Sequence, residues 1–218
     1  MFVLCRKYTE TRGALRGQAV RESLKIVLLC GAAAILYGTI QDLVTTRICV
    51  EYFTIGHPPV WGGTWNPTVL ALTWGFLATW WVGLFLGIPA AFLSRIGARP
   101  KLAWRDLLMP LAILMLVIGG CAIAAGALAS IRVAPPPAGY VPLLGDEYPR
   151  ETHHAFLVDL AAHQAAYMAG FAGGVVCLGW IWWQRGRMER AALREQLHQL
   201  REKSAELLAI VKAKPARP

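Results

Sequence analysis

The sequence has few charged residues for its length, since Asp, Glu, Lys and Arg together make up only 16% of its 218 residues. Hydrophobic residues make up 56%, and the mean hydropathy is +0.45. A soluble globular domain usually has about 25% charged residues. This shortage of charge excludes an ordinary soluble domain and indicates a protein whose helices lie in a lipid bilayer.

The sequence also lacks the short motifs that identify common enzyme sites. It contains no P-loop, no dinucleotide-binding glycine motif between a strand and a helix, no GxSxG motif and no set of kinase motifs. Its five cysteines include no CxxC pair, and three of them lie in long apolar runs. We therefore expect neither a disulfide framework nor a cysteine-based metal site. A non-enzymatic role is the preferred interpretation.

Four long apolar runs dominate the sequence, at residues 24–40, 69–93, 107–130 and 155–183. A helix needs about 20 residues to cross the hydrocarbon core of a bilayer. The first run is interrupted by Gln41 and Asp42, but its helix is expected to continue through Thr46. The pattern predicts an all-α membrane protein, a bundle of four transmembrane helices at about 24–46, 68–93, 107–130 and 155–183.

The Lys and Arg residues alternate between the connections of these runs. Of 22, 19 lie around the start of the first run, between the second and third runs, or after the fourth. The other two connections carry only Arg47, Arg132 and Arg150. Because cytoplasmic loops retain Lys and Arg, both termini are predicted to be cytoplasmic. That side has net charge +12 and the outer side −3, which favours anionic lipid headgroups as the partner and excludes nucleic acid.

The cytoplasmic ends flank the four-span domain at 24–183. Residues 1–23 form a basic cytoplasmic segment, and residues 213–218 are expected to be disordered. Residues 184–212 are predicted to form a cytoplasmic amphipathic helix. Its coiled-coil-like spacing is carried by Leu193, Leu197, Leu200, Ser204, Leu207 and Val211. Residues 185–212 therefore offer a contact surface for a second copy or another protein, although a helix lying on the membrane fits equally well.

Residues 41–68 form a long connection on the outer side. This segment mixes β-branched and aromatic residues with Gly and Pro, which predicts a structured lid rather than a flexible linker. Asn66 followed by Pro67 is a helix start signal for the second span. Asp106 is expected to cap the third span in the same way.

Small residues recur every four positions in three of the spans, and such stripes allow membrane helices to approach closely. In the second span they are Gly75, Thr79, Gly83 and Gly87; in the fourth, Ala162, Ala166, Gly170 and Gly174; in the third, Cys121, Ala125 and Ala129.

Polar residues gather on the outer side, which holds four of the five His residues. Asp159, His163 and Tyr167 share one helical face because they are four residues apart. With residues of the first span and the lid they define candidate ligands for a divalent metal, zinc or iron, or for another cation. The candidate site residues are Asp42, Glu51, His57, Asp159 and His163.

Other interpretations of these polar residues stay open. A structural polar network is favoured, in which His163 bonds Asp42 or Asp159, and Arg47 pairs with Glu51. Asp159 also lies near a helix N-terminus, where a carboxylate is favourable. Catalytic proton transfer is a further alternative. A haem cofactor is not expected, because no other span contains a second His.

Two segments, residues 37–58 and 74–102, resemble a family of bacterial multi-pass membrane proteins without an assigned function. The shared residues are Tyr37, Gly38, Asp42, Thr45, Glu51, Tyr52, Phe53, Thr54 and the Ala-Thr-Trp-Trp-x-Gly motif at 78–83. Relatives tend to carry His-Asp-Gln where this chain has Gln41-Asp42-Leu43, which removes one ligand from any metal site on the first span. The resemblance implies the cytoplasmic (inner) membrane of a bacterium and brings no activity with it.

These observations favour a structural or accessory membrane protein with an outward-facing polar cluster. The alternative is a component that binds or transports a cation, a metal or a small solute. A second alternative is a membrane enzyme that uses Asp159 and His163.

Overall fold

The computed structural model describes residues 2–132 and 149–213, and in these two ranges the chain is all-helical, without a strand. Most of the second outer connection and the expected disordered tail lie outside the described residues. Four helical stretches are long and apolar enough to cross a membrane, namely Gly17–Thr45, Pro67–Arg95, Trp104–Arg132 and His153–Ala209. For the described residues, the predictions of an all-α fold and of four stretches that could span a membrane are confirmed, while the topology and the orientation in the membrane stay predictions.

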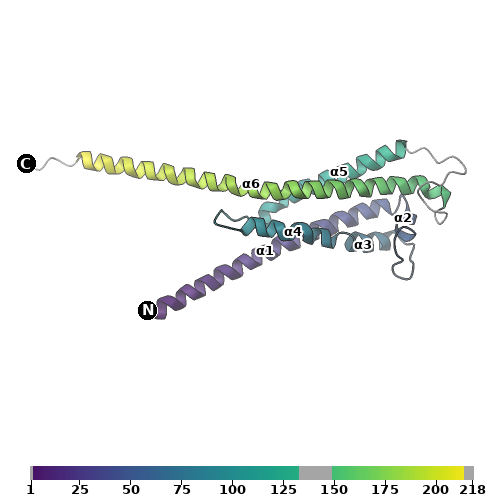
Figure 1. Ribbon diagram of the computed structural model, residues 1–218, viewed down its shortest axis with the longest axis horizontal. Helices are drawn as coiled ribbons and strands as arrows, with labels where there is room; N and C mark the ends of the chain where they lie inside the picture. Colours follow the sequence, from purple (N-terminus) through teal and green to yellow (C-terminus); the bar gives the residue numbers. More distant parts are fainter. Residues whose placement is uncertain (1, 133–148, 214–218) are drawn as a thin grey trace, which may run out of the picture.

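The first and last helices extend well beyond their spans. Helix α1 (Phe2–Thr45) and helix α6 (His153–Ala213) are each continuous, and at 1.5 Å per residue α6 is about 90 Å long. Figure 1 shows both helices leaving the other elements at the same end of the molecule. The expected cytoplasmic helix at 184–212 is thus a direct continuation of the fourth span. A short 3-10 helix, η2 (Arg150–Thr152), precedes α6.

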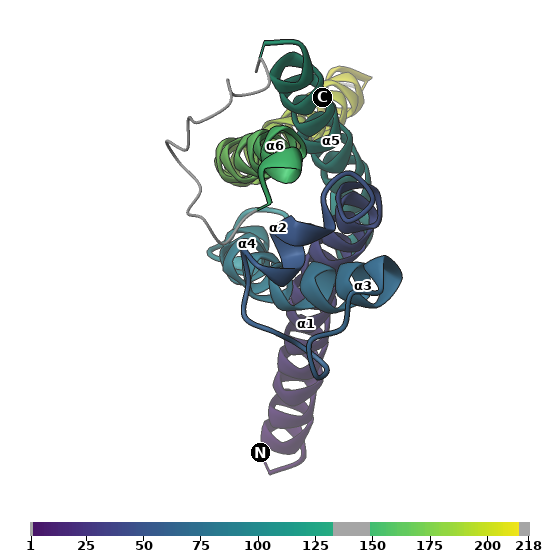
Figure 2. The same cartoon turned by 90° about the vertical axis from the view of Figure 1, so that its right-hand side faces the viewer.

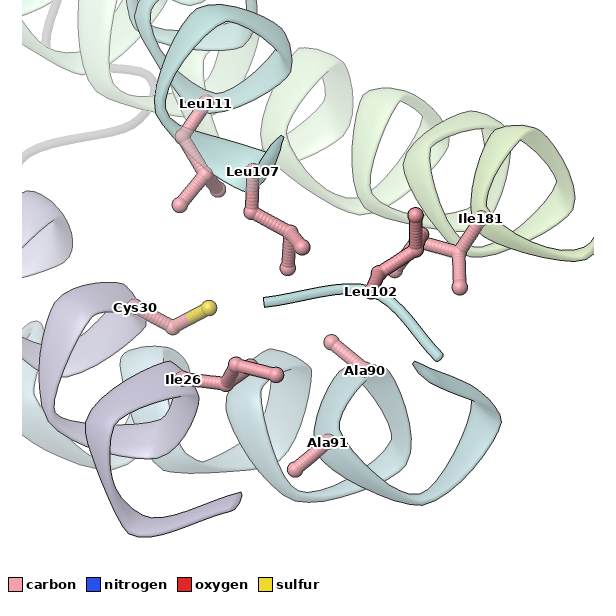
Figure 3. Packing of buried hydrophobic residues seen from close by; sticks show 8 residues of the cluster. All are labelled: Ile26, Cys30, Ala90, Ala91, Leu102, Leu107, Leu111 and Ile181. Carbon is pink, nitrogen blue, oxygen red and sulfur yellow. The ribbon is translucent and has the colours of Figure 1, made fainter. Parts of the chain in front are cut away.

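The spans form two pairs. Helix α1 packs along α3 (Pro67–Leu77) and α4 (Trp80–Arg95), whereas α5 (Leu108–Arg132) packs along α6. Contacts between α4 and α6 join the two pairs. Figure 3 shows apolar side chains from all four spans meeting near the turn between α4 and α5, where the 3-10 helix η1 (Trp104–Leu107) lies. This core consists of Ile26, Cys30, Ala90, Ala91, Leu102, Leu107, Leu111 and Ile181.

The small residues of the second span lie at a close helix contact, as predicted, and the helix they contact is α1. A Cβ atom added at Gly83 would lie 2.5 Å from the Cα atom of Gly31, and one at Gly75 would lie 2.5 Å from the Cα atom of Thr39. Both distances are far below van der Waals contact, so only glycine permits this approach of two backbones. The stripe therefore sets the separation of α1 from α3 and α4.

The small residues of α5 contact α6 through a different face from the one predicted. Ala122 and Gly126 are buried against Ala162, whereas Cys121 is exposed. The prediction for α5 was wrong by one position, because several small residues follow one another there and spacing alone does not select a face. On α6, Ala162 and Ala166 pack as expected.

The second span is broken in its middle, although one continuous helix was predicted. At the break, the N–H of Thr79 bonds the carbonyl of Phe76 at 3.2 Å, and its hydroxyl donates to the carbonyl of Gly75. A threonine hydroxyl that bonds the carbonyl four residues earlier competes with the regular helix ladder. The Thr79 side chain also packs on Gly38 of α1, so the close helix contact holds it in place.

The two predicted helix starts have different outcomes. The side-chain oxygen of Asn66 accepts bonds from the N–H groups of Thr68 and Val69 at 3.0 and 3.2 Å, so Asn66 is confirmed as the cap of α3. Asp106 lies inside η1, and its carboxylate accepts from the N–H of Ala103 at 2.7 Å. It was therefore wrongly predicted as the cap of α5, because an intervening 3-10 turn begins earlier.

Candidate functional site

A short helix in the 41–68 connection covers the end of the bundle opposite the chain termini. Helix α2 (Val50–Thr54) contacts both α6 and α3, and its Phe53 is buried. Figure 2, which faces this end, shows α2 lying between α6 and α3. From here on, the name lid is used only for residues 46–58, the part of the 41–68 connection that carries α2. It continues through a turn in which Trp61, Gly62 and Gly63 all have positive φ.

Beneath the lid, a His and an Asp from different spans meet. The Nε2 atom of His163 on α6 lies 3.3 Å from Oδ1 of Asp42 at the end of α1. Both residues are buried. Because 121 positions separate them in sequence, this contact ties the first span directly to the last. Asp159 and His163, predicted to share one helical face, both lie buried in the bundle.

The other ring nitrogen of His163 determines where the protons are. Its Nδ1 lies 2.8 Å from the backbone carbonyl oxygen of Asp159. A carbonyl only accepts hydrogen bonds, so Nδ1 must carry a proton. The contact between Nε2 and the carboxylate of Asp42 then needs one further proton, held by either partner. The pair has zero net charge in both arrangements.

The third buried group, Asp159, has no such partner. Its exposed fraction is 0%, and neither side-chain oxygen accepts a hydrogen bond from any described residue. It lies one turn before His163 on the same face of α6. A buried carboxylate without a partner is strongly destabilising as an anion, so Asp159 needs either a proton or a positive charge beside it.

Aromatic rings from the lid and α3 enclose these polar groups. The ring of Tyr52 stacks on His163 with centroids 4.7 Å apart, and Phe53 contacts the same imidazole edge-on at 5.8 Å. His57 is held by a 2.7 Å contact between its Nδ1 and the carbonyl of Tyr52, and it packs on Trp74 of α3. Burial also raises the pKa of the Tyr52 hydroxyl above its usual value. The cluster is therefore enclosed in an apolar surrounding.

Glu51, another sequence candidate, contacts the lid itself rather than the buried pair. Its Oε2 lies 3.5 Å from the Sγ of Cys49. Cys49 is almost fully buried, and burial together with the nearby Glu51 carboxylate raises the pKa of its thiol to about 12. At neutral pH this cysteine is an unreactive thiol.

The five candidate residues thus do not converge on one point. Asp42, Asp159 and His163 come together, whereas Glu51 and His57 lie in the lid beside them. Within the described part of the chain, no group of three or more His, Cys, Asp or Glu side chains is arranged to hold a metal ion. The hypothesis of a divalent metal site therefore has no geometric support among these residues.

Two neighbouring expectations, on Arg47 and on Tyr167, also have clear outcomes. The predicted Arg47–Glu51 pair is wrong, because the guanidinium of Arg47 donates to the carbonyl of Leu43 and, at 3.0 Å, to the hydroxyl of Thr68. Tyr167 lies on the predicted face but is 53% exposed, so it stands outside the enclosed cluster. The ring of His154 contacts the carbonyl of Ser130 at 3.3 Å.

A second buried charge lies near the opposite, terminal end of the bundle. Arg185 of α6 is fully buried, and its guanidinium donates to four backbone carbonyls in the last turn of α4 and in the segment that follows it. The acceptors are Leu93, Ile96, Arg99 and Pro100. The side chain of Arg99 in turn pairs with Glu189 at 3.0 Å and lies over the ring of Trp182. Arg185 therefore fixes the turn between α4 and α5 onto α6.

Sequence reasoning identified the acids and histidines but missed the aromatic rings and Arg185. Tyr52 and Phe53 directly follow Glu51 in the sequence, yet nothing in their spacing shows that they reach across to α6. Arg185 is one of nine basic residues after the fourth apolar run, and its type alone does not separate it from the exposed ones.

Comparison of this chain with protein-family models, curated proteins and solved structures finds no match. The class of protein therefore rests on the fold. Its described residues are all-helical, with four stretches long and apolar enough to cross a membrane, a buried polar cluster at one end of the bundle and a buried, hydrogen-bonded arginine near the other.

Proposed function

We propose that this protein is a non-enzymatic structural or accessory component of the bacterial inner membrane. In this proposal both termini lie in the cytoplasm, in accordance with the distribution of Lys and Arg, and the lid faces outward. The buried cluster under the lid fastens the outer connection to the bundle. The cytoplasmic part of α6 contacts a partner or a second copy of the chain.

The observation that carries this proposal is the contact between His163 and Asp42 with Tyr52 stacked on the imidazole. Three elements meet at one imidazole: α6 supplies the ring, α1 supplies the carboxylate and the lid supplies the aromatic cover. Removing one partner of a buried pair leaves a polar group without compensation, which typically costs about 3–5 kcal/mol. The cluster therefore provides a strong local reason for the lid to remain docked.

The partner surface is the exposed side of the long cytoplasmic extension of α6. Leu193, Leu197, Leu200 and Leu207 are all more than half exposed. Two copies inserted in the same orientation would emerge with these helices parallel, as a parallel coiled coil requires. Partner contact by residues 185–212 is thus part of the proposed accessory role.

A second candidate function is the outward-facing binding of a cation or small solute. The specific observation in its favour is the buried carboxylate of Asp159, which has no partner among the described residues. The fastening role requires the pair of His163 and Asp42 but gives no reason for Asp159.

Cys49 provides a direct test of the fastening role. In a variant that keeps Cys49 as its only cysteine, we expect very slow reaction with a membrane-impermeant maleimide, because the thiol is buried and its pKa is about 12. Replacing His163 with leucine leaves Asp42 unpaired and removes the ring on which Tyr52 stacks. We expect the labelling rate of Cys49 to rise at least about tenfold, equivalent to about 1.4 kcal/mol of lid docking.

The matched control is Glu151→Gln, which changes an exposed outer acid outside the cluster and should leave the rate unchanged. Asp42→Asn tests the other side of the same contact and should act in the direction of His163→Leu. Slow labelling that stays at the parent rate in both cluster variants would show that the pair does not hold the lid.

A further inference from the structure

The net charge of the buried cluster can be counted from its hydrogen bonds. His163 and Asp42 together are neutral, whichever of them holds the shared proton, because Nδ1 is committed to the carbonyl of Asp159. As a carboxylate, Asp159 adds one negative charge, and neither of its oxygens receives a hydrogen bond from a described residue. With Asp159 ionised, the three residues therefore lack one positive charge.

Apart from His163, the contacts of the described residues place no cation beside the Asp159 carboxylate. The charged groups acting on Asp159 are His163 and Asp42. The lid contributes Cys49 and Tyr52, whose pKa values are raised by burial, so both are neutral at physiological pH. The basic residue of the first outer connection, Arg47, is turned away toward Leu43 and Thr68. Glu51 is occupied with Cys49 and would only add negative charge.

The space around Asp159 and the size of its charge limit which cations can neutralise it. A groove of about 570 Å³ between α1, α5 and α6 is bordered by Val158 and Ala162, and none of the three cluster residues lines it. The aromatic rings around the cluster contact one another at centroid distances of 5–6 Å. An organic cation would have to displace these rings, and a divalent ion would exceed the charge deficit and lacks a third ligand group among the described residues.

We propose that the cluster is an outward-facing site for one unit of positive charge, a proton or a monovalent metal ion, taken up beside the carboxylate of Asp159 beneath the lid. This inference rests on the second candidate function and names its ligand class. The His163–Asp42 pair has no net charge of its own. The proton or ion is therefore bound by the carboxylate of Asp159 alone. Release of the ligand leaves a bare buried carboxylate and favours opening of the lid.

The test measures reversible unfolding of the full-length protein in mixed detergent micelles, with the Asp159→Asn variant beside the parent protein. The amide has nearly the shape of the acid but no charge to compensate. If a proton is the ligand, the folded parent protein still holds at neutral pH a proton that Asp159 of the unfolded chain has already released in mildly acidic solution. Raising the pH then lowers the folded-to-unfolded ratio of the parent, by up to tenfold per pH unit, and affects Asp159→Asn less.

If a monovalent ion is the ligand, the parent gains stability when Na⁺ or K⁺ replaces a bulky organic cation at constant ionic strength and pH. Near saturation, each tenfold increase in the free ion raises the folded-to-unfolded ratio by about tenfold, and the variant does not respond. In alkaline buffer without either ion, Asp159→Asn should be at least as stable as the parent. Glu151→Gln is the control for a general effect of removing an outer acid.

An identical response of the parent and Asp159→Asn to pH and to both ions would overturn the proposal, as would stabilisation by Zn²⁺ or Ca²⁺ alone. If the variant does not fold, the infrared spectrum of the parent protein still tests for the proposed site. A buried, protonated carboxyl band that disappears at high pH or on addition of Na⁺ or K⁺ supports the site. The absence of both this band and any ion response contradicts it. The fastening role is judged separately, by whether His163→Leu and Asp42→Asn raise the labelling rate of Cys49.

Discussion

Replacing Arg185 with alanine should destabilise the protein by about 4 kcal/mol, among the largest effects expected for any single side chain. The substitution removes donors from four backbone carbonyls in the turn between α4 and α5. Each buried acceptor left unsatisfied costs about 1–3 kcal/mol, and partial access of water to this end of the bundle reduces the sum. The measurement is the free energy of unfolding in mixed micelles.

Two further variants separate the geometry of this contact from its charge. Arg185→Lys keeps the positive charge, but an ammonium group has three donors and no planar fork, so we expect it to recover less than half of the loss. Arg187→Ala removes an exposed arginine that lies over Trp183, and it should cost less than about 1 kcal/mol. Equal stabilities of Arg185→Ala and Arg187→Ala would show that the turn does not depend on the buried guanidinium.

The second large effect is expected from replacing Gly83 with leucine. Even a Cβ atom at this position would lie 2.5 Å from the Cα atom of Gly31 and 2.8 Å from the carbonyl oxygen of Cys30. These are backbone atoms and cannot rotate away, so α4 must move off α1 along the whole contact. We expect a loss of about 3 kcal/mol in the free energy of unfolding, with Gly83→Ala intermediate.

Gly120→Leu provides the matched control for this prediction. Gly120 lies in the middle of α5, and a Cβ atom there meets nothing within 4 Å. Its replacement makes the same change in helix propensity and apolar volume without a steric clash, so it should be neutral or stabilising. If both leucine variants lose equal stability, close approach of α1 and α4 is not the reason for glycine at 83.

The sequence predicts the features of this fold that depend on local chemistry or on composition. The four spans follow from long apolar runs, and the start of α3 follows from Asn66 and Pro67, which act within one helical turn. The contact face of the second span follows from small residues at every fourth position, three of them glycines. Each of these features has one physical cause, which depends only on residues close together in the sequence.

Features that depend on contacts between distant segments are not predictable in this way. At the break, the Thr79 side chain packs on Gly38 of α1, which is about forty residues away in the sequence. The carbonyls that accept from Arg185 lie almost ninety residues before it. Asp106 has the right type and place for a cap, but a 3-10 turn alters the bonds available to it. For the site, the residue types were recognisable, yet the separation of Glu51 from Asp42 depends on how the lid docks.

The orientation of the outer cluster underlies both functional proposals, and cysteine accessibility in intact cells tests it most directly. In a cysteine-free background, one variant carries Trp61→Cys, at a 75% exposed position beyond the lid, and another carries Leu207→Cys on the far part of α6. A membrane-impermeant maleimide should label the variant at 61 in intact cells and the variant at 207 only after the membrane is permeabilised. Labelling at 207 but not at 61 in intact cells would place the cluster in the cytoplasm and contradict the account.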